Sequence, residues 1–365
     1  MSKRIDQMDK NFSAKGLDRR DGLMWLDSSD RRLVMRGLGW YRENKKRFNR
    51  LPMRAQKIVR EDVWTLARCP ASARLCFRSD TAQLSVKVTN AEVMPSPHMP
   101  AVGHSGIQVF VGEPFRMRPW MTTVPSLEVP HSESPLLAKM SREMREYTIY
   151  LPLYNYLERL SLGFSPGARF APPSPPSWKK PAVFYGTSIT QGGCASTAGS
   201  DYVSTLGRLL NLDVINLGFS GNGRGEPEMA RLISEMDASL FVLDYVANVI
   251  PPQLRRTLPE FYRILRRKHP HTPILLMSKV MYGHASYSRE HRELQESMRD
   301  IMIHFYSKMR RAGDANLHFV DGTALIPFGT AGAYVDGVHP TDLGFRMMAE
   351  RLAPFIEMIL SSTAC

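Results

Sequence analysis

The chain has 365 residues, 43% hydrophobic and 23% charged, a composition typical of a folded globular protein rather than a disordered or disulfide-framed one. Residues 1–180 carry the whole net charge of +13, with 30 Lys and Arg against 17 Asp and Glu, whereas residues 181–365 carry 18 of each. Because these basic residues are interspersed and form no base-reading motif, they favour a solvated face and argue against a specific nucleic-acid site.

The opening of the chain, residues 1–21, mixes charged and polar side chains without an apolar run, and we interpret it as a polar tail. No apolar stretch approaches the ~20 residues of a bilayer span, so no membrane contact is expected. A cytoplasmic location is the expectation, and a trimmed secretory leader is the alternative left open. Cysteines at Cys69, Cys76, Cys194 and Cys365 predict reduced thiols, with a Cys69–Cys76 bridge left open. Their spacing does not suit zinc, and no metal or cofactor is expected.

Residues 22–170 are dominated by alternation of apolar and polar side chains, the period of half-buried strands. The clearest segments are Leu84–Thr89, Ile107–Val111, Tyr147–Leu153 and Leu160–Phe164. At this length two domains are the default, and the first is predicted to be an antiparallel β-sandwich.

A proline-rich segment, residues 171–180, follows and is interpreted as a linker, because proline fixes an extended backbone and removes amide donors. Residues 181–365 then form the second predicted domain.

In that second region short apolar runs alternate with helical patterns, which predicts an α/β fold with a parallel sheet and helices on both faces. Predicted strands are Ala182–Tyr185, Val214–Leu217, Leu240–Asp244, Ile274–Ser278 and His318–Val320. Predicted helices are Asp201–Leu210, Glu226–Met236, Gln253–Lys268, Ser288–Arg311 and one from Thr341 towards Leu360. Ser200 and Thr341 are predicted N-caps, and Pro227 is predicted in a first turn.

Four loops at the carboxyl ends of these strands carry the polar residues of interest. They are Gly186–Gly193, Gly218–Gly223, Asp244–Asn248 and Asp336–Pro340. Since ligands of parallel α/β sheets bind beyond the carboxyl ends of the strands, we expect the loops to converge on one site.

The residue types in these loops suit acyl transfer. A serine hydroxyl such as Ser188 needs a base, and an imidazole such as His339 can take its proton near neutral pH. Asp336 can accept the other ring N–H and hold the tautomer. The backbone N–H groups of Ser188 and Gly221 and the side-chain amide of Asn248 are predicted to stabilise the oxyanion.

In order and spacing the four loops resemble the Ser, Gly, Asn and His blocks of the SGNH (GDSL-like) hydrolases. The resemblance implies a flavodoxin-like sheet and the roles just given for Ser188, Gly221, Asn248, Asp336 and His339. Two departures indicate a divergent subgroup. Thr187 stands where the family has Asp, and the third block lacks its usual leading Gly and trailing Asp.

The first region also resembles a known module. Gly106–Val111 and Leu151–Asn155 are similar to segments of two-domain SGNH esterases, in which a β-sandwich, here jelly-roll-like, precedes the hydrolase domain. The resemblance implies a carbohydrate or small-ester deacylase, or a relative that transfers acyl groups to other acceptors.

Each site residue also has an interpretation without chemistry. Ser188 could be a turn residue, Asn248 a helix cap, and Cys194 a packing residue rather than a nucleophile. Arg224 could contact a substrate, but local pairing with Glu226 or Glu228 is favoured. The order of all four blocks outweighs these readings.

We therefore expect a serine esterase that hydrolyses short-chain, acetyl esters of carbohydrates, with a small-molecule or oligosaccharide ester as its partner. Two alternatives stay open: an acyltransferase to a sugar or natural-product hydroxyl, and a polyanion-binding module with an inert hydrolase domain. The sequence leaves homo-oligomer formation open.

Overall fold

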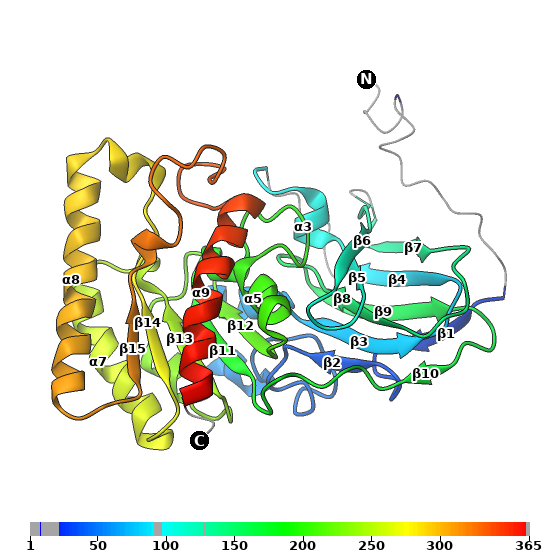
Figure 1. Ribbon diagram of the computed structural model, residues 1–365, viewed down its shortest axis with the longest axis horizontal. Helices are drawn as coiled ribbons and strands as arrows, with labels where there is room; N and C mark the ends of the chain where they lie inside the picture. Colours follow the sequence, from blue (N-terminus) through cyan, green and yellow to red (C-terminus); the bar gives the residue numbers. More distant parts are fainter. Residues whose placement is uncertain (1–7, 9–21, 91–96, 127–128, 363–365) are drawn as a thin grey trace.

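A computed structural model describes residues 22–90, 97–126 and 129–362, together with Met8 (Figure 1). The rest of the predicted tail, residues 1–21, lies outside the described residues, as does Cys365. Two antiparallel sheets occupy the right of Figure 1, and a parallel sheet with its helices occupies the left.

The two N-terminal sheets pack as a β-sandwich, as predicted. One has the order β1-β9-β4-β7, with β1 at Met24–Asp27, β9 at Leu157–Phe164, β4 at Leu84–Asn90 and β7 at His131–Leu137. The other has the order β10-β3-β8-β5-β6, with β10 at Phe170–Ala171, β3 at Arg74–Ser79, β8 at Arg145–Tyr150, β5 at Gln108–Val111 and β6 at Arg118–Thr122. A short strand, β2 (Val34–Arg36), pairs with β3.

The alternation seen in the sequence has the predicted meaning in the sandwich. In β4, Leu84, Val86 and Val88 are buried, while the intervening side chains are partly or fully exposed. The buried set joins side chains of β3, β8 and β9 in one apolar core between the two sheets. Burial of one face per sheet is what stabilises such a sandwich.

The C-terminal sheet is parallel throughout, with the order β12-β11-β13-β14-β15. Its strands are β11 (Ala182–Gly186), β12 (Val214–Gly218), β13 (Leu240–Asp244), β14 (Ile274–Met277) and β15 (Leu317–Val320). This 2-1-3-4-5 order is flavodoxin-like and places the switch point between β11 and β13, where ligands bind in such folds.

Helices cover both faces of the parallel sheet. They are α4 (Ser188–Gln191), α5 (Tyr202–Leu210), α6 (Pro227–Ile233), α7 (Pro251–Lys268), α8 (Arg289–Arg311) and α9 (Asp342–Ser362). Val183 and Tyr185 of β11 face the core shared with α6, α7 and α8, whereas Ala182 and Phe184 face α5 and α9. None of the helices in the described part of the chain is both long and apolar enough for a bilayer span.

Predicted helix bounds differ from the structure in several places; α7, for example, begins at Pro251 rather than at Gln253. The N-cap of α5 is Asp201 and not Ser200, because the Asp201 carboxylate accepts the N–H of Ser204 at 2.8 Å. Helix α6 ends at Ile233 instead of reaching Met236. Pro227 and Thr341 have their predicted places, and the Thr341 hydroxyl accepts the N–H of Gly344.

The N-terminal half also packs directly onto the parallel sheet. A short helix, α2 (Glu61–Ala67), and Trp40 belong to the same apolar core as Ile215 and Leu217 of β12. The Arg50 guanidinium is fully buried there and donates to the carbonyls of Asn216 and Gly218 at 3.1 and 2.6 Å. It also donates to the carbonyls of Cys69 and Leu66 and stacks on Phe219. Sequence reasoning did not anticipate this connection.

Candidate active site

The loop after β11 begins with Thr187 as the N-cap of α4, and Ser188 is the first helical residue. The Thr187 hydroxyl accepts the N–H of Ile189 at 3.3 Å, and the Thr190 hydroxyl accepts the N–H of Thr187 at 3.1 Å. Thr187 therefore supplies the capping oxygen that the family's Asp would supply. The substitution noted in the sequence leaves the start of α4 intact.

The structure brings Ser188, His339 and Asp336 into one chain of hydrogen bonds. Ser188 Oγ lies 2.9 Å from His339 Nε2, and His339 Nδ1 lies 2.7 Å from Asp336 Oδ2. The other carboxylate oxygen, Oδ1, accepts the N–H groups of Val338 and His339 at 3.0 and 2.8 Å. Asp336 thus orients the ring and the turn that carries it.

The charge state of Asp336 suits this position. Although partial burial acts in the opposite direction, hydrogen bonds from the backbone and ring of His339 and from the Val338 N–H lower the pKa of Asp336 to about 2. The side chain is therefore a carboxylate near neutral pH. It can accept a ring N–H and favour the positive imidazolium.

The loop after β12 lies against the end of β11. Gly223 approaches Gly186 so closely that an added Cβ would lie 1.9 Å from the Gly186 carbonyl oxygen. Gly221 has φ +66°, a left-handed conformation that favours glycine. These positions explain why the loop is rich in glycine.

Asn248 connects the β13 loop to the β12 loop. In the amide orientation that satisfies the neighbouring donors, its Oδ1 accepts the N–H groups of Asn222 and Gly223 at 3.1 and 3.2 Å. Asn248 lies in a short 3-10 helix, η2 (Val246–Asn248), just after β13. The structure therefore brings Asn248 to the loop of Gly221.

Several neighbours of Ser188 were not identified from the sequence. Gln191 accepts the N–H of Ser220 at 3.1 Å and donates to the Leu153 carbonyl at 3.2 Å, so it joins α4 to the β12 loop and to the N-terminal half. The Tyr154 hydroxyl donates to the Ser188 carbonyl at 3.4 Å. In the sequence, Gln191 could have been identified only by its position in the same loop as Ser188. Tyr154 could have been identified only by its position in Leu151–Asn155, the segment that resembles the SGNH esterases.

Asp244, at the end of β13, links α4 to α5 by hydrogen bonds. It is buried and accepts the hydroxyls of Thr190 and Tyr202, both at 2.8 Å. Burial raises its pKa to about 7, although the two hydrogen bonds act in the opposite direction. The sequence indicated that Asp244 lies at the end of a strand. It did not indicate that Asp244 is buried, because that depends on the packing of Tyr202 from α5.

Cys194 follows α4 and is buried beside His339. Burial, with a contribution from Asp336, raises the pKa of this thiol to about 11. It is therefore protonated near neutral pH and does not act as a thiolate nucleophile. Among the described cysteines there is no disulfide, so the Cys69–Cys76 bridge does not form.

Arg224 contacts Glu226 as the sequence suggested, but through its backbone N–H, which donates to the Glu226 carboxylate at 3.3 Å. The Arg224 guanidinium donates to the Gly221 carbonyl at 3.1 Å, and the Glu226 carboxylate also binds Arg60 of the N-terminal half. The difference has a tertiary cause, since Arg60 is distant in the sequence.

Comparison with protein families identifies the chain. A model of the GDSL-like lipase/acylhydrolase family matches residues 179–357, and a model of the N-terminus of SGNH-hydrolase-type esterases matches residues 23–170. The chain belongs to the GDSL-like (SGNH) hydrolase family. None of the curated proteins matches it.

Solved structures of similar proteins agree with the family. A Bacteroides ovatus ATCC 8483 protein described as a GDSL-like lipase is 27% identical, covers 93% of this chain and 98% of its own, and has a TM-score of 0.85. The salicylyl-acyltransferase SsfX3 from a tetracycline biosynthetic pathway is 20% identical, with the same shares covered and a TM-score of 0.76. A family two carbohydrate esterase from Clostridium thermocellum, in complex with cellohexaose, is 15% identical over 93% and 99% of the chains, with a TM-score of 0.59. The last two share the fold of this hydrolase.

Proposed function

We propose that this SGNH hydrolase is a serine esterase that removes short acyl groups, foremost acetyl, from hydroxyls of carbohydrates. The observation that carries the proposal is the hydrogen-bonded chain from Ser188 Oγ through His339 to Asp336. The carbohydrate substrate is supported by the fold shared with family two carbohydrate esterases.

In the first half-reaction, Ser188 Oγ bonds to the acyl carbonyl carbon while His339 Nε2 takes the hydroxyl proton. The carbonyl oxygen becomes an oxyanion, for which the N–H groups of Ser188 and Gly221 and the NH₂ of Asn248 are the proposed donors. The intermediate then expels the sugar oxygen, which receives the proton from His339. Ser188 is left as an acyl ester.

In the second half-reaction, a water molecule gives a proton to His339 and attacks the acyl carbon. Collapse of the second intermediate breaks the bond to Ser188 Oγ, which recovers its proton. The products are the free sugar hydroxyl and a carboxylic acid.

The test is the substitution Ser188→Ala with p-nitrophenyl acetate as substrate. Removal of the nucleophile should lower kcat by about 10³-fold or more, with the melting temperature unchanged. Ser239→Ala is the matched control. Ser239 lies just before β13, at the end of the sheet opposite Ser188, and its hydroxyl donates to the Pro181 carbonyl. More than a few per cent of wild-type activity in Ser188→Ala would rule out the nucleophile.

Acyl transfer to an alcohol other than water is the second candidate. It is favoured by the higher TM-score to the salicylyl-acyltransferase, 0.76, than to the carbohydrate esterase, 0.59. Product analysis with sugar and phenol acceptors separates the two: release of free acid alone, across the whole acceptor panel, would exclude transfer. A panel of acetylated oligosaccharides and aryl esters of graded chain length would define the substrate.

A further inference from the structure

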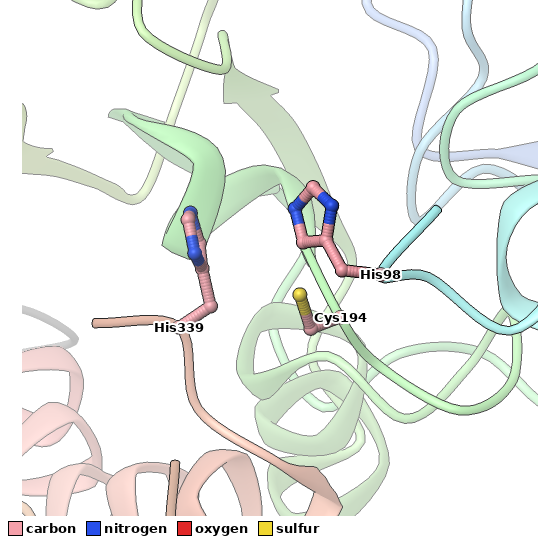
Figure 2. Close-up of side chains that lie close together, drawn as sticks. All are labelled: His98, Cys194 and His339. Carbon is pink, nitrogen blue, oxygen red and sulfur yellow. The ribbon is translucent and has the colours of Figure 1, made fainter. Parts of the chain in front are cut away.

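Three side chains of types that can bind a metal ion come from separate segments and meet at His339 of the candidate active site. They are His98, Cys194 and His339 (Figure 2). One nitrogen of each imidazole and the Cys194 sulfur lie within 4.8 Å of one another. His98 comes from the N-terminal half, just before the short helix α3 (Ala101–Ser105), whereas Cys194 follows α4 and His339 Nε2 lies 2.9 Å from Ser188 Oγ.

The donor set suits Zn²⁺ better than a hard cation. Two imidazoles and a thiol are nitrogen and sulfur ligands, and tetrahedral zinc sites with three protein ligands leave one position open. Ideal zinc bonds would place these donor atoms about 3.3–3.6 Å apart, so they must approach by roughly 1 Å. His98 is exposed and can supply that movement by rotating its side chain.

The nitrogen that His339 can offer is the one that catalysis needs. Its Nδ1 is held by Asp336 at 2.7 Å, which leaves Nε2, 2.9 Å from Ser188 Oγ. A zinc ion on Nε2 would occupy the lone pair that takes the serine proton. Metal binding and base catalysis at His339 are therefore mutually exclusive.

We propose that His98, Cys194 and His339 form an inhibitory Zn²⁺ site that closes the active site reversibly. Zinc binds with loss of the Cys194 thiol proton to solvent, and a water molecule takes the fourth position. The binding part of this proposal is independent of the proposed function, whereas the inhibition rests on it.

Binding is tested with Co²⁺ as a spectroscopic probe on the full-length Ser188→Ala variant, which retains all three ligands. Coordination by a thiolate should produce a sulfur-to-cobalt charge-transfer band and intense tetrahedral d–d bands, both abolished by added Zn²⁺. In the same background Cys194→Ser should lose the charge-transfer band. His98→Ala should weaken binding about tenfold or more. Absence of the band in Ser188→Ala would overturn the site, whatever the enzyme's activity.

Inhibition is tested by titrating Zn²⁺ into the wild-type enzyme during ester hydrolysis and then adding EDTA. Activity should fall and return, while His98→Ala and Cys194→Ser keep their zinc-free activity and require at least about tenfold more Zn²⁺. His131→Ala and Cys76→Ser are the matched controls, on β7 and β3 of the sandwich, and should keep wild-type sensitivity. Equal sensitivity of His98→Ala and wild type would refute the proposal. His98 is exposed, so this variant should fold even if Cys194→Ser does not.

Discussion

The two halves of the hydrolase expose their sheets differently. Every residue of β11, β12 and β13 is buried, because helices cover both faces of the parallel sheet. In the sandwich burial is uneven: nearly every residue of β3 and β8 is buried, β4 buries alternate residues, and β6 exposes nearly all of its residues. Side chains at the ends of the parallel strands are thus held from two sides. Among the described residues, the N-terminal half contacts α4 through Leu153 and Tyr154, which follow β8.

This contrast predicts that substitutions in the two halves have different effects. Substitutions in the loops that follow the parallel strands should change chemistry with little effect on stability. Substitutions in the N-terminal half that reach the parallel sheet, above all at Arg50, should change stability first.

Asp336→Asn should have the largest effect. An amide cannot hold the required tautomer of His339 in the way the carboxylate does, so kcat should fall about 10⁴-fold, or about 5 kcal/mol in the barrier. Steady-state kinetics on p-nitrophenyl acetate measures the loss, and a thermal melt close to wild type shows that folding is retained. A loss below tenfold would remove Asp336 from the proposed mechanism.

Arg50→Ala tests whether the two halves are energetically coupled. It leaves four backbone carbonyls, three of them buried, without this donor, so the free energy of unfolding should fall by about 3–5 kcal/mol. Urea denaturation measures the change. Activity should fall as well, since two of these carbonyls belong to β12, which leads into the Gly221 loop.

The control for this prediction is Arg54→Ala. Arg54 lies in the same half but is about half exposed, where it pairs with Glu43 and Glu235. Its loss should cost about 1 kcal/mol or less. Similar losses at Arg50 and Arg54 would mean that the buried connection does not couple the halves.

Asn248→Ala should lower kcat by about 10²–10³-fold, the usual cost of one oxyanion donor. Asn248→Asp separates the donor from the structural brace, because it keeps an oxygen for the N–H groups of Asn222 and Gly223 but loses the NH₂. Both variants should be slow in single-turnover assays. Full activity of Asn248→Asp would show that Asn248 only supports the loop.

Asp244→Asn should have the smallest effect and should appear as a change in pH dependence. Because burial raises the Asp244 pKa from 3.8 to about 7, the folded state holds a proton that the unfolded state releases. The contribution of Asp244 to the free energy of unfolding is fully present below about pH 4. It declines as the pH rises to 7, by on the order of 2 kcal/mol between pH 5 and 7. The variant should lack this decline in melting temperature, and parallel pH profiles for the two proteins would contradict the assignment.

Much of the fold was predictable because apolar residues follow different patterns in the two halves of the sequence. The alternation in Leu84–Thr89 indicated a strand with one buried face, and the short apolar runs after Pro181 indicated a parallel sheet buried on both faces. The N-cap of α5 was predicted at Ser200 and lies at Asp201, since neighbouring polar residues can cap equally well in sequence. The end of α6 was predicted at Met236 and lies at Ile233. The packing of Trp40 and α2 onto β12 had no local signal.

The sequence by itself determined which loops could meet, because the carboxyl ends of parallel strands share one edge; Ser188, Gly221, Asn248, Asp336 and His339 could be named on that ground. Only the tertiary structure decided which distant groups surround them. Arg50 on the β12 carbonyls, Gln191 between three segments, and His98 beside Cys194 depend on contacts between residues far apart in the chain. Such contacts arise from packing across the two halves, and no short sequence pattern encodes that packing.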